Sequence, residues 1–271
     1  MHGHVTSISV APLCALALAA GALGFLPSSQ GAPEGDGPEP FDFEQASRDV
    51  LKPREILSHV KKHMVPLDFR IISDEIVSSD TIPSLKLRKV TAHFNSQELA
   101  GKVWGHPCVL FLPVDSQRNQ SPERLGKVVI VASPGGGYFP VHVDKYGDPI
   151  AARTGYPTMV LSNPGTYPDG SEIERDMRVL GTLARQTGTY YYNMNCQLAV
   201  VYIQAMNAFQ EFLGVPELKA IVGGHSKRGR SAVVAAAMDP RVASPIMMGH
   251  EGVYTRDRVP SHLSYHLDFF Q

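Results

Sequence analysis

Short apolar runs alternate with helix-forming segments between residues 127 and 250, and this alternation constrains the fold more than any other feature of the sequence. The runs lie at 127–133, 156–165, 218–224 and 244–250. Such runs, with β-branched residues and flanking turn signals, are typical of strands that are buried on both faces of a sheet. The pattern predicts an α/β fold with an open, mostly parallel sheet and helices on both faces.

Three segments between these runs are predicted to be helices, at residues 144–155, 195–213 and 231–238. The second has the clearest signal, because its apolar residues recur at helical spacing and Gly214 with Pro216 supplies a stop. A long loop with an acidic patch is expected after the strand in 156–165.

The residues before this alternation have a different pattern. Residues 43–63 have helical spacing interrupted by Pro53. Residues 69–80, 85–94 and 99–115 are strand-like, with polar turns between them. We expect a short N-terminal helical region followed by an antiparallel meander at one edge of the sheet.

The first residues have the character of an export signal. Residues 10–26 carry no charge, and residues 28–40 are rich in small residues, proline and acid. We predict a signal peptide at 1–31, a disordered linker at 32–42 and an α/β domain at 43–271. Export to the periplasm or the extracellular space follows. The alternative is that residues 10–26 anchor the chain in a membrane.

Charge and cysteine content narrow the possible partners. The formal net charge is −1 and no long block of Lys or Arg occurs, so nucleic acid is not an expected partner. Cys14 would be removed with the signal. Cys108 lies in an apolar strand-like stretch and Cys196 in an apolar helix, so both are predicted to be buried free thiols.

The stretch AIVGGHSKRGRS, residues 220–231, contains a candidate nucleophile, Ser226. A nucleophilic serine on a strand-to-helix turn usually stands in G-x-S-x-G. Gly224 occupies the first glycine position, but Arg228 occupies the second and the glycine follows at Gly229. The turn would present Ser226 at the carboxyl edge of the sheet, where ligands bind in such folds. The alternative is that Ser226 only caps the helix.

A second motif, PGGGY at residues 134–138, follows the strand 127–133. In α/β-hydrolases the oxyanion is bound by the N–H of the residue after the nucleophile and by another N–H from a loop that is often glycine-rich. We therefore predict an oxyanion site formed by Gly135, Gly136, Gly137 and Lys227. A nucleotide phosphate loop is the alternative, but the G-K-S/T ending is missing.

Several stretches between Trp104 and Val242 resemble the PhoPQ-activated pathogenicity-related proteins, an α/β-hydrolase-like family. They are VWGHPCVLFLP, VVIVASPGGG, IAARTGYPTMVLSNPGTYPDG, QLAVVYIQAMNAFQEFLG and GGHSKRGRSAVVAAAMDPRV. The resemblance implies that Ser226 is the nucleophile, Lys227 its basic neighbour and 135–137 part of the oxyanion region. It also implies a second glycine three residues after the serine. Glucuronoyl esterases have a similar elbow, in which a basic residue follows the serine.

Three basic residues, Lys227, Arg228 and Arg230, stand together at the start of the predicted helix. Positive charge is unfavourable there because it opposes the helix dipole. For Lys227 a role in binding an anionic group or the oxyanion competes with a surface ion pair. For Arg228 and Arg230 we expect surface ion pairs.

A serine nucleophile needs a histidine base and an acid, which in this fold follow the serine in the sequence. After Ser226 the histidines are His250, His262 and His266, and Glu251 at a strand end is the candidate catalytic acid. We expect the chain to be shortened relative to its family, without the last strands. A metal pair at His262 and His266 is a weaker alternative, because the Glu of H-E-x-x-H is missing.

The sequence thus predicts a secreted esterase or amidase that forms an acyl-enzyme on Ser226, without a cofactor or metal. The substrate would be a small-molecule, peptide or glycan ester. The alternative is a noncatalytic hydrolase-like binding protein that lacks the usual Asp and His.

Overall fold

The computed structural model describes residues 53–114, 124, 126–187 and 190–249. The predicted signal peptide, the linker and the first part of the N-terminal helical region lie outside these residues, as does everything from residue 250 onward. Within the described residues, no helix is long and apolar enough to cross a membrane.

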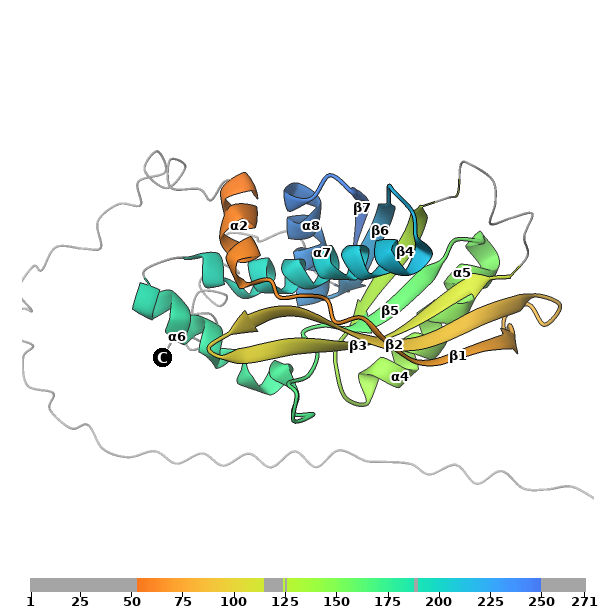
Figure 1. The fold of residues 1–271 in the computed structure, drawn as a ribbon, viewed down its shortest axis with the longest axis horizontal. Coiled ribbons are helices and arrows are strands. Elements are labelled where there is room, and N and C mark those ends of the chain that lie inside the picture. The colour runs from red at the N-terminus through yellow and green to blue at the C-terminus, as the bar shows by residue number, and fades with distance from the viewer. Residues whose placement is uncertain (1–52, 115–123, 125, 188–189, 250–271) are drawn as a thin grey trace, which may run out of the picture. The chain divides into compact units, whose positions relative to one another are not determined.

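A seven-stranded mixed sheet forms the centre of the domain, with strand order β1-β2-β3-β5-β4-β6-β7 (Figure 1). β1, β2, β3 and β5 pair in antiparallel fashion along one half of the sheet. β5, β4, β6 and β7 are parallel to one another. The strands are β1 (Arg70–Ser78), β2 (Lys86–Leu99), β3 (Lys102–Pro113), β4 (Lys127–Ser133), β5 (Thr158–Ser162), β6 (Lys219–His225) and β7 (Val242–Met248). The predicted parallel region and the antiparallel meander at one edge are both confirmed.

Helices cover both faces of this sheet, as predicted (Figure 1). One face carries α2 (Pro53–Val60), α7 (Met194–Leu213) and α8 (Lys227–Met238), and the other carries α4 (Tyr138–His142), η2 (Val143–Gly147) and α5 (Asp148–Thr154). The remaining helical elements are η1 (Lys61–His63), η3 (Ile173–Asp176), α6 (Arg178–Thr187) and η4 (Tyr190–Tyr192).

The alternation of side chains along β4 shows why both faces need a cover. Ile130 belongs to the larger hydrophobic core, which includes most of α7. Val129 and Val131 belong to a second core with Val143 and Ala151 of the opposite helices. Since successive residues of a strand point to opposite faces, a strand with a continuous apolar run, as in β4 from Val128 to Ala132, must be buried on both sides. Cys108 and Cys196 are buried free thiols, as predicted.

Three predicted elements need correction. The helix predicted at 231–238 begins earlier, at Lys227, directly after the turn at Ser226. Its first turn therefore includes the three basic residues that oppose the helix dipole. The segment 144–155 is not one helix: a π-helical turn precedes α5. The expected long loop contains α6, whose Leu180 is buried and whose Val179 and Leu183 pack against the core. That i, i+1, i+4 spacing of apolar residues was a detectable helical signal.

The W-x-H stretch of β3 fixes the loop that follows β5. Trp104 and His106 are both fully buried. The His106 Nδ1–H donates to the carbonyl oxygen of Ser162 at 2.9 Å, and the Ser96 hydroxyl donates to Nε2 at 2.7 Å. Gly105 and Thr166 exchange two backbone hydrogen bonds of 2.8 Å. The segment after Ser162 is therefore held against β3 where it leaves the sheet.

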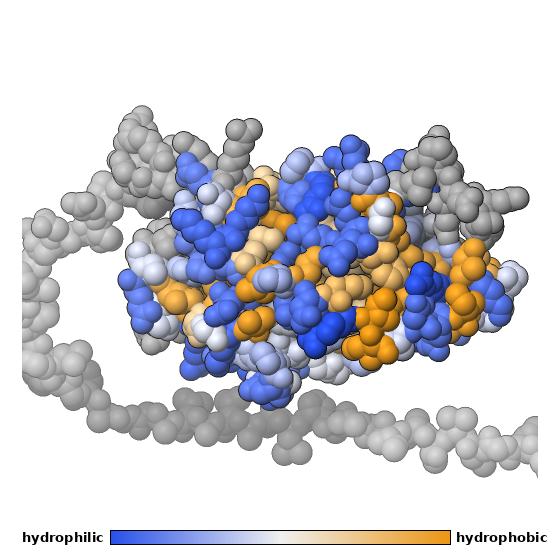
Figure 2. Space-filling model, in the orientation of Figure 1, coloured by the Kyte–Doolittle hydropathy of each residue, from blue (hydrophilic) through white to orange (hydrophobic). Residues whose placement is uncertain are grey.

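Hydrophobic and hydrophilic residues are intermixed on the face shown in Figure 2. The most exposed large apolar side chains of the sheet's N-terminal edge are on β1, namely Ile71, Ile72 and Ile76. Charged residues on the same strand interrupt this row, which limits edge-to-edge association.

Candidate functional site

Ser226 occupies a strained turn between β6 and α8. Its φ is 52° and its ψ is −124°, a combination that non-glycine residues rarely adopt. The side chain makes no capping hydrogen bond to the helix, and the residue is exposed. The helix-cap alternative is therefore not supported. The backbone N–H of Ser226 donates to the Met248 carbonyl at 2.9 Å, which ties the turn to the end of β7.

Two glycines allow this turn to be compact. A Cβ on Gly224 would stand 2.6 Å from Cβ of Arg228 and 2.8 Å from the Tyr202 hydroxyl. A Cβ on Gly229 would stand 2.7 Å from the Gly224 carbonyl oxygen and 2.7 Å from Cγ of Met247. Gly229 thus lets α8 pack tightly against β6 and β7, and this second glycine of the elbow lies three residues after the serine.

Arg228 is buried, so the expectation of a surface ion pair was wrong for this residue. Its side chain is 6% exposed. The Nε–H donates to the Asn163 carbonyl at 2.7 Å, and a terminal nitrogen contacts Oε2 of Glu174 at 2.5 Å. The Lys227 ammonium forms an ion pair with the other oxygen of the same carboxylate. Glu174, on η3, therefore places one negative charge against two of the cations that oppose the dipole of α8.

The predicted oxyanion corner follows β4, as expected, and lies beside a carboxylate. Gly136 has a φ of +61°, which favours glycine. A Cβ on Gly135 would stand 3.3 Å from Oε1 of Glu172, and a Cβ on Gly136 only 2.5 Å from the same atom. Glu172 Oε2 in turn forms a 3.1 Å ion pair with Arg175. A negative charge therefore lies against Gly135 and Gly136, while Gly137 has open space around it.

A cluster of aromatic and imidazole rings lies next to the elbow. The Tyr146 hydroxyl and Nε2 of His225 are 2.5 Å apart in a hydrogen bond. The ring of His142 is centred 5.5 Å from that of His225, and its buried Nδ1 has no hydrogen-bond partner among the described residues. Burial, followed by the charges of neighbouring His225, Lys145 and Arg228, lowers the pKa of His142. The imidazole of His142 is consequently harder to protonate than that of an exposed histidine.

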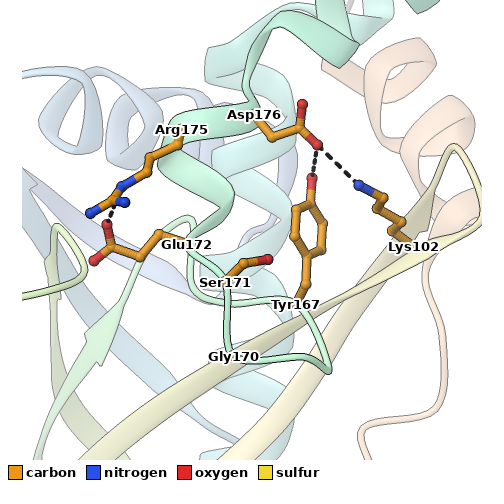
Figure 3. Close-up of a pocket in the computed structure, with 7 residues that line it drawn as sticks. All are labelled: Lys102, Tyr167, Gly170, Ser171, Glu172, Arg175 and Asp176. Atoms are coloured by element: carbon orange, nitrogen blue, oxygen red, sulfur yellow. Dashed lines mark hydrogen bonds and ion pairs between the residues drawn. The ribbon is translucent and has the colours of Figure 1, made fainter.

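The loop after β5 bears a second group of polar contacts (Figure 3). Asp176 accepts a 3.1 Å hydrogen bond from the Tyr167 hydroxyl and pairs with the Lys102 ammonium at 3.3 Å. Burial, then the hydrogen bond to Asp176, raises the pKa of the Tyr167 phenol well above its usual range. Glu172, Glu174 and Asp176 thus alternate along η3 and its start, and no two of them share a cation.

Ser226, Lys227 and the glycine corner all follow parallel strands, so the structure places these predicted site residues at the same edge of the sheet. Glu251, His250, His262 and His266 lie outside the described residues. Asp239 lies at the opposite end of the 12-residue helix α8, where its carboxylate binds Arg241 at 2.8 Å. A helix of that length is about 18 Å long, so Asp239 is not a partner of Ser226.

Sequence reasoning missed the individual roles of Glu172 and Glu174. The only signal was the acidic patch expected in the loop after β5, which did not indicate which cations these carboxylates bind. Among the described residues, no group of three or more His, Cys, Asp or Glu side chains is placed to hold a metal ion.

Comparisons with known proteins give distant structural similarity. No protein-family model and no curated protein sequence matches the chain. Among solved structures, it is similar to a putative acetyl xylan esterase from Bacteroides fragilis, with 16% identity over 72% of this chain and 53% of that one, and a TM-score of 0.45. Acetyl xylan esterase 1 from Thermoanaerobacterium sp. gives 12% identity, coverages of 70% and 55%, and a TM-score of 0.42.

A glucuronoyl esterase from Solibacter usitatus is also similar, with 12% identity over 74% of this chain and 58% of that one, and a TM-score of 0.43. The chain spans between 53% and 58% of the length of these three structures. The similarity is too distant to carry the activities of those enzymes over to this chain. Its own mixed sheet, helices on both faces and serine turn between β6 and α8 constitute an α/β-hydrolase-like fold.

Proposed function

We propose that this protein is a serine hydrolase of esterase or amidase type with Ser226 as its nucleophile. The backbone of Ser226 carries the proposal: φ is positive at an exposed serine, on a strand-to-helix turn, with no capping hydrogen bond. Strain of this kind costs on the order of 1–3 kcal/mol and clusters at functional sites. A serine that served only the turn would be replaceable by glycine at lower cost.

The proposed reaction is acyl transfer through an acyl-enzyme. The Ser226 Oγ attacks the carbonyl carbon while a histidine takes the hydroxyl proton. The N–H of Lys227, in the first turn of α8 where the N–H groups have no helical acceptor, and an N–H of the glycine corner bind the developing oxyanion. The C–O or C–N bond then breaks, the histidine returns the proton to the leaving group, and water releases the acid by the same steps.

The two cations of the elbow fit this chemistry. Glu174 holds both Lys227 and Arg228, so the charge beside the serine is fixed in position rather than mobile in solvent. Preorganised charge of this kind lowers the energy of the oxyanion without reorganisation during the reaction.

The sequence features outside the described residues extend the proposal. The uncharged run at 10–26 with the following Pro-rich segment supports export. The S-K-R-G and D-P-R-V stretches support membership of the PhoPQ-activated pathogenicity-related proteins, and Glu251 is proposed as the catalytic acid.

The alternative function is a noncatalytic binding protein with the same fold. One observation favours it: Glu172 places a carboxylate against the glycine corner. A negative charge there disfavours a second negative charge on a bound oxyanion. In this alternative the protein binds its ligand without turnover.

Measuring hydrolysis of p-nitrophenyl acetate, together with labelling by a fluorophosphonate probe, tests the proposal. Replacing Ser226 by Ala is expected to abolish labelling and to lower the rate by about 10³-fold or more. Ser244→Ala, at an exposed serine of β7, is the matched control and should keep both. A wild-type protein that takes up no probe, or equal rates for wild type and Ser226→Ala, would exclude Ser226 as the nucleophile and favour the binding protein.

A further inference from the structure

Two adjoining pockets flank the loop that follows β5. The smaller has a volume of about 380 Å³ and is lined by the residues of Figure 3. The larger, of about 510 Å³, is bordered by β2, β3 and the same loop. Tyr167 and Gly170 line both pockets, so the two adjoin, and together we call them the depression.

This depression lies at the edge of the sheet that bears the elbow. β5, β4 and β6 are parallel neighbours, so their carboxyl ends, which lead into the pocket loop, the glycine corner and Ser226, share that edge. A spacing of about 4.8 Å between strands puts the end of β6 roughly 10 Å from the end of β5. Glu172 joins the two regions, because it lines the smaller pocket and contacts Gly135 and Gly136.

The charges that line the pockets are compensated. Lys102 pairs with Asp176 at 3.3 Å, Arg175 with Glu172 at 3.1 Å, and Arg70 with Asp68 at 3.1 Å. A ligand with a net charge would have to displace one of these partners. An uncharged ligand can hydrogen-bond to the paired groups as they stand.

The other lining groups are mainly small and polar. Ser171, Thr166, Asn95 and His93 supply hydroxyl, amide and imidazole groups. The ring of Tyr167 is largely buried, and in the larger pocket the other apolar side chains are the small Val103 and Pro168. These pockets offer many hydrogen-bonding groups beside a comparable area of apolar surface, a combination that suits the hydroxyl groups and the C–H faces of sugar rings.

His93 contributes an imidazole to this lining, and its Nδ1 has no hydrogen-bond partner among the described residues. That nitrogen is itself buried, so it can hydrogen-bond to a ligand hydroxyl only after the ring turns toward the pocket.

We propose that the depression formed by these two pockets binds an uncharged, hydroxyl-rich sugar chain. This inference rests on the proposed hydrolase function. The sugar chain would be part of the ester substrate, and the ester group would lie at Ser226. The roughly 10 Å between β5 and β6 requires a ligand longer than one sugar ring. The substrate is then an ester of an oligosaccharide rather than of a simple alcohol.

Binding is measured in the full-chain Ser226→Ala protein, which separates binding from turnover. Saturation-transfer NMR and calorimetry would use three neutral tetrasaccharides, namely cellotetraose, xylotetraose and maltotetraose. A galacturonic acid tetramer and butyrate serve as the charged and apolar probes. Lys102→Met and Asn95→Leu each alter one pocket. Lys86→Met, an exposed lysine at the other end of β2 that bonds Ser78, is the matched control.

At least one neutral tetrasaccharide is expected to bind. Its Kd should rise tenfold or more in Lys102→Met and in Asn95→Leu. In Lys86→Met the Kd should stay unchanged. Circular dichroism of each variant establishes that it is folded, and either pocket variant alone is sufficient for the test. The proposal is overturned if no neutral sugar binds, if only the charged or apolar probe binds, or if both folded pocket variants bind sugar like the parent.

The result of this sugar-binding experiment does not depend on whether the protein is a hydrolase. Sugar binding in a chain whose wild type takes up no fluorophosphonate supports the sugar site and rejects the hydrolase. Fluorophosphonate labelling without sugar binding does the reverse.

Discussion

At the scale of single residues, the elbow shows how a displaced glycine can serve a nucleophile turn. Arg228 stands where G-x-S-x-G has its second glycine, and its Cβ faces Gly224. Because Gly224 has no side chain, the larger residue at 228 is accommodated. The close contact with the neighbouring strand passes to Gly229, which lies under the Gly224 carbonyl and Met247. The requirement for a small residue is thus met one position later.

Replacing Gly229 by Ala should therefore destabilise the protein. In an ordinary helix this change is stabilising by up to about 1 kcal/mol. Here the new methyl would meet backbone and side-chain atoms at 2.7 Å, and we expect a loss of about 1–3 kcal/mol in the free energy of unfolding by urea. Gly137→Ala is the control for stability, because a Cβ there meets nothing within 4 Å. If both variants unfold at the same urea concentration, the close contact at Gly229 has no energetic consequence.

At the scale of elements, the segment from Gly165 to Asp176 connects the two halves of the site. Its carboxylates bind cations that come from β3, from α8 and from within the segment itself. The segment is also fixed to β3 through Gly105 and Thr166. Ion pairs here do not add much net stability, because desolvation offsets their attraction, but removing one partner leaves an uncompensated charge.

Glu174→Gln should consequently destabilise the protein more than a comparable change at an exposed pair. Arg228 is buried but Glu174 is about a third exposed, so we expect a cost of about 2 kcal/mol rather than the full penalty for a wholly buried pair. Asp74→Asn, which breaks the exposed pair with Arg88 on the sheet, should cost about 0–1 kcal/mol.

Adding Arg228→Met to Glu174→Gln should recover part of the loss, since the unpaired buried charge is then removed. Chemical unfolding of the four proteins measures these differences. A double variant no more stable than Glu174→Gln would contradict this explanation.

At the scale of the whole molecule, one buried histidine links the stability of the fold to pH. Burial lowers the pKa of His106 to about 3, while its hydrogen bond to the Ser162 carbonyl acts in the opposite direction. The unfolded chain binds a proton at this residue below about pH 6.5, whereas the folded chain does not. The contribution to stability is complete above the unfolded pKa and is lost as the pH falls from about 6.5 towards about 3.

Between pH 7 and pH 5, this single group should lower the free energy of unfolding by about 2 kcal/mol. His106→Gln removes that part of the pH dependence, so the variant should lose about 2 kcal/mol less than the wild type over the same interval. Other histidines with lowered pKa values remain in both proteins, so their contributions to the pH dependence cancel in the comparison. They are His59, His63, His93 and His142. The free energy of unfolding is measured with urea at both pH values. If wild type and His106→Gln lose the same amount between pH 7 and pH 5, this part of the pH dependence does not come from His106.

Local patterns in the sequence determined the central parallel strands, helix α7 and the turn at Ser226. β4 is apolar from Val128 to Ala132, and α7 repeats apolar residues over 20 positions with Gly214 at its end. Such patterns are set by which faces a segment must bury, and they need no knowledge of its neighbours. The same holds for the glycine corner, because its conformation depends on the residues within it.

Only the tertiary structure decided where the charges of the site lie. Arg228 and Glu174 are 54 residues apart, and nothing near either residue in the sequence indicates that their side chains form an ion pair. A buried arginine needs a partner for its charge, and here a distant segment supplies it, so the expectation of a surface ion pair failed there. The placement of Glu172 against Gly136 likewise depends on how the loop after β5 folds back over β4. Periodicity along a chain records which faces are buried, but the pairing of groups across the fold depends on three-dimensional distance.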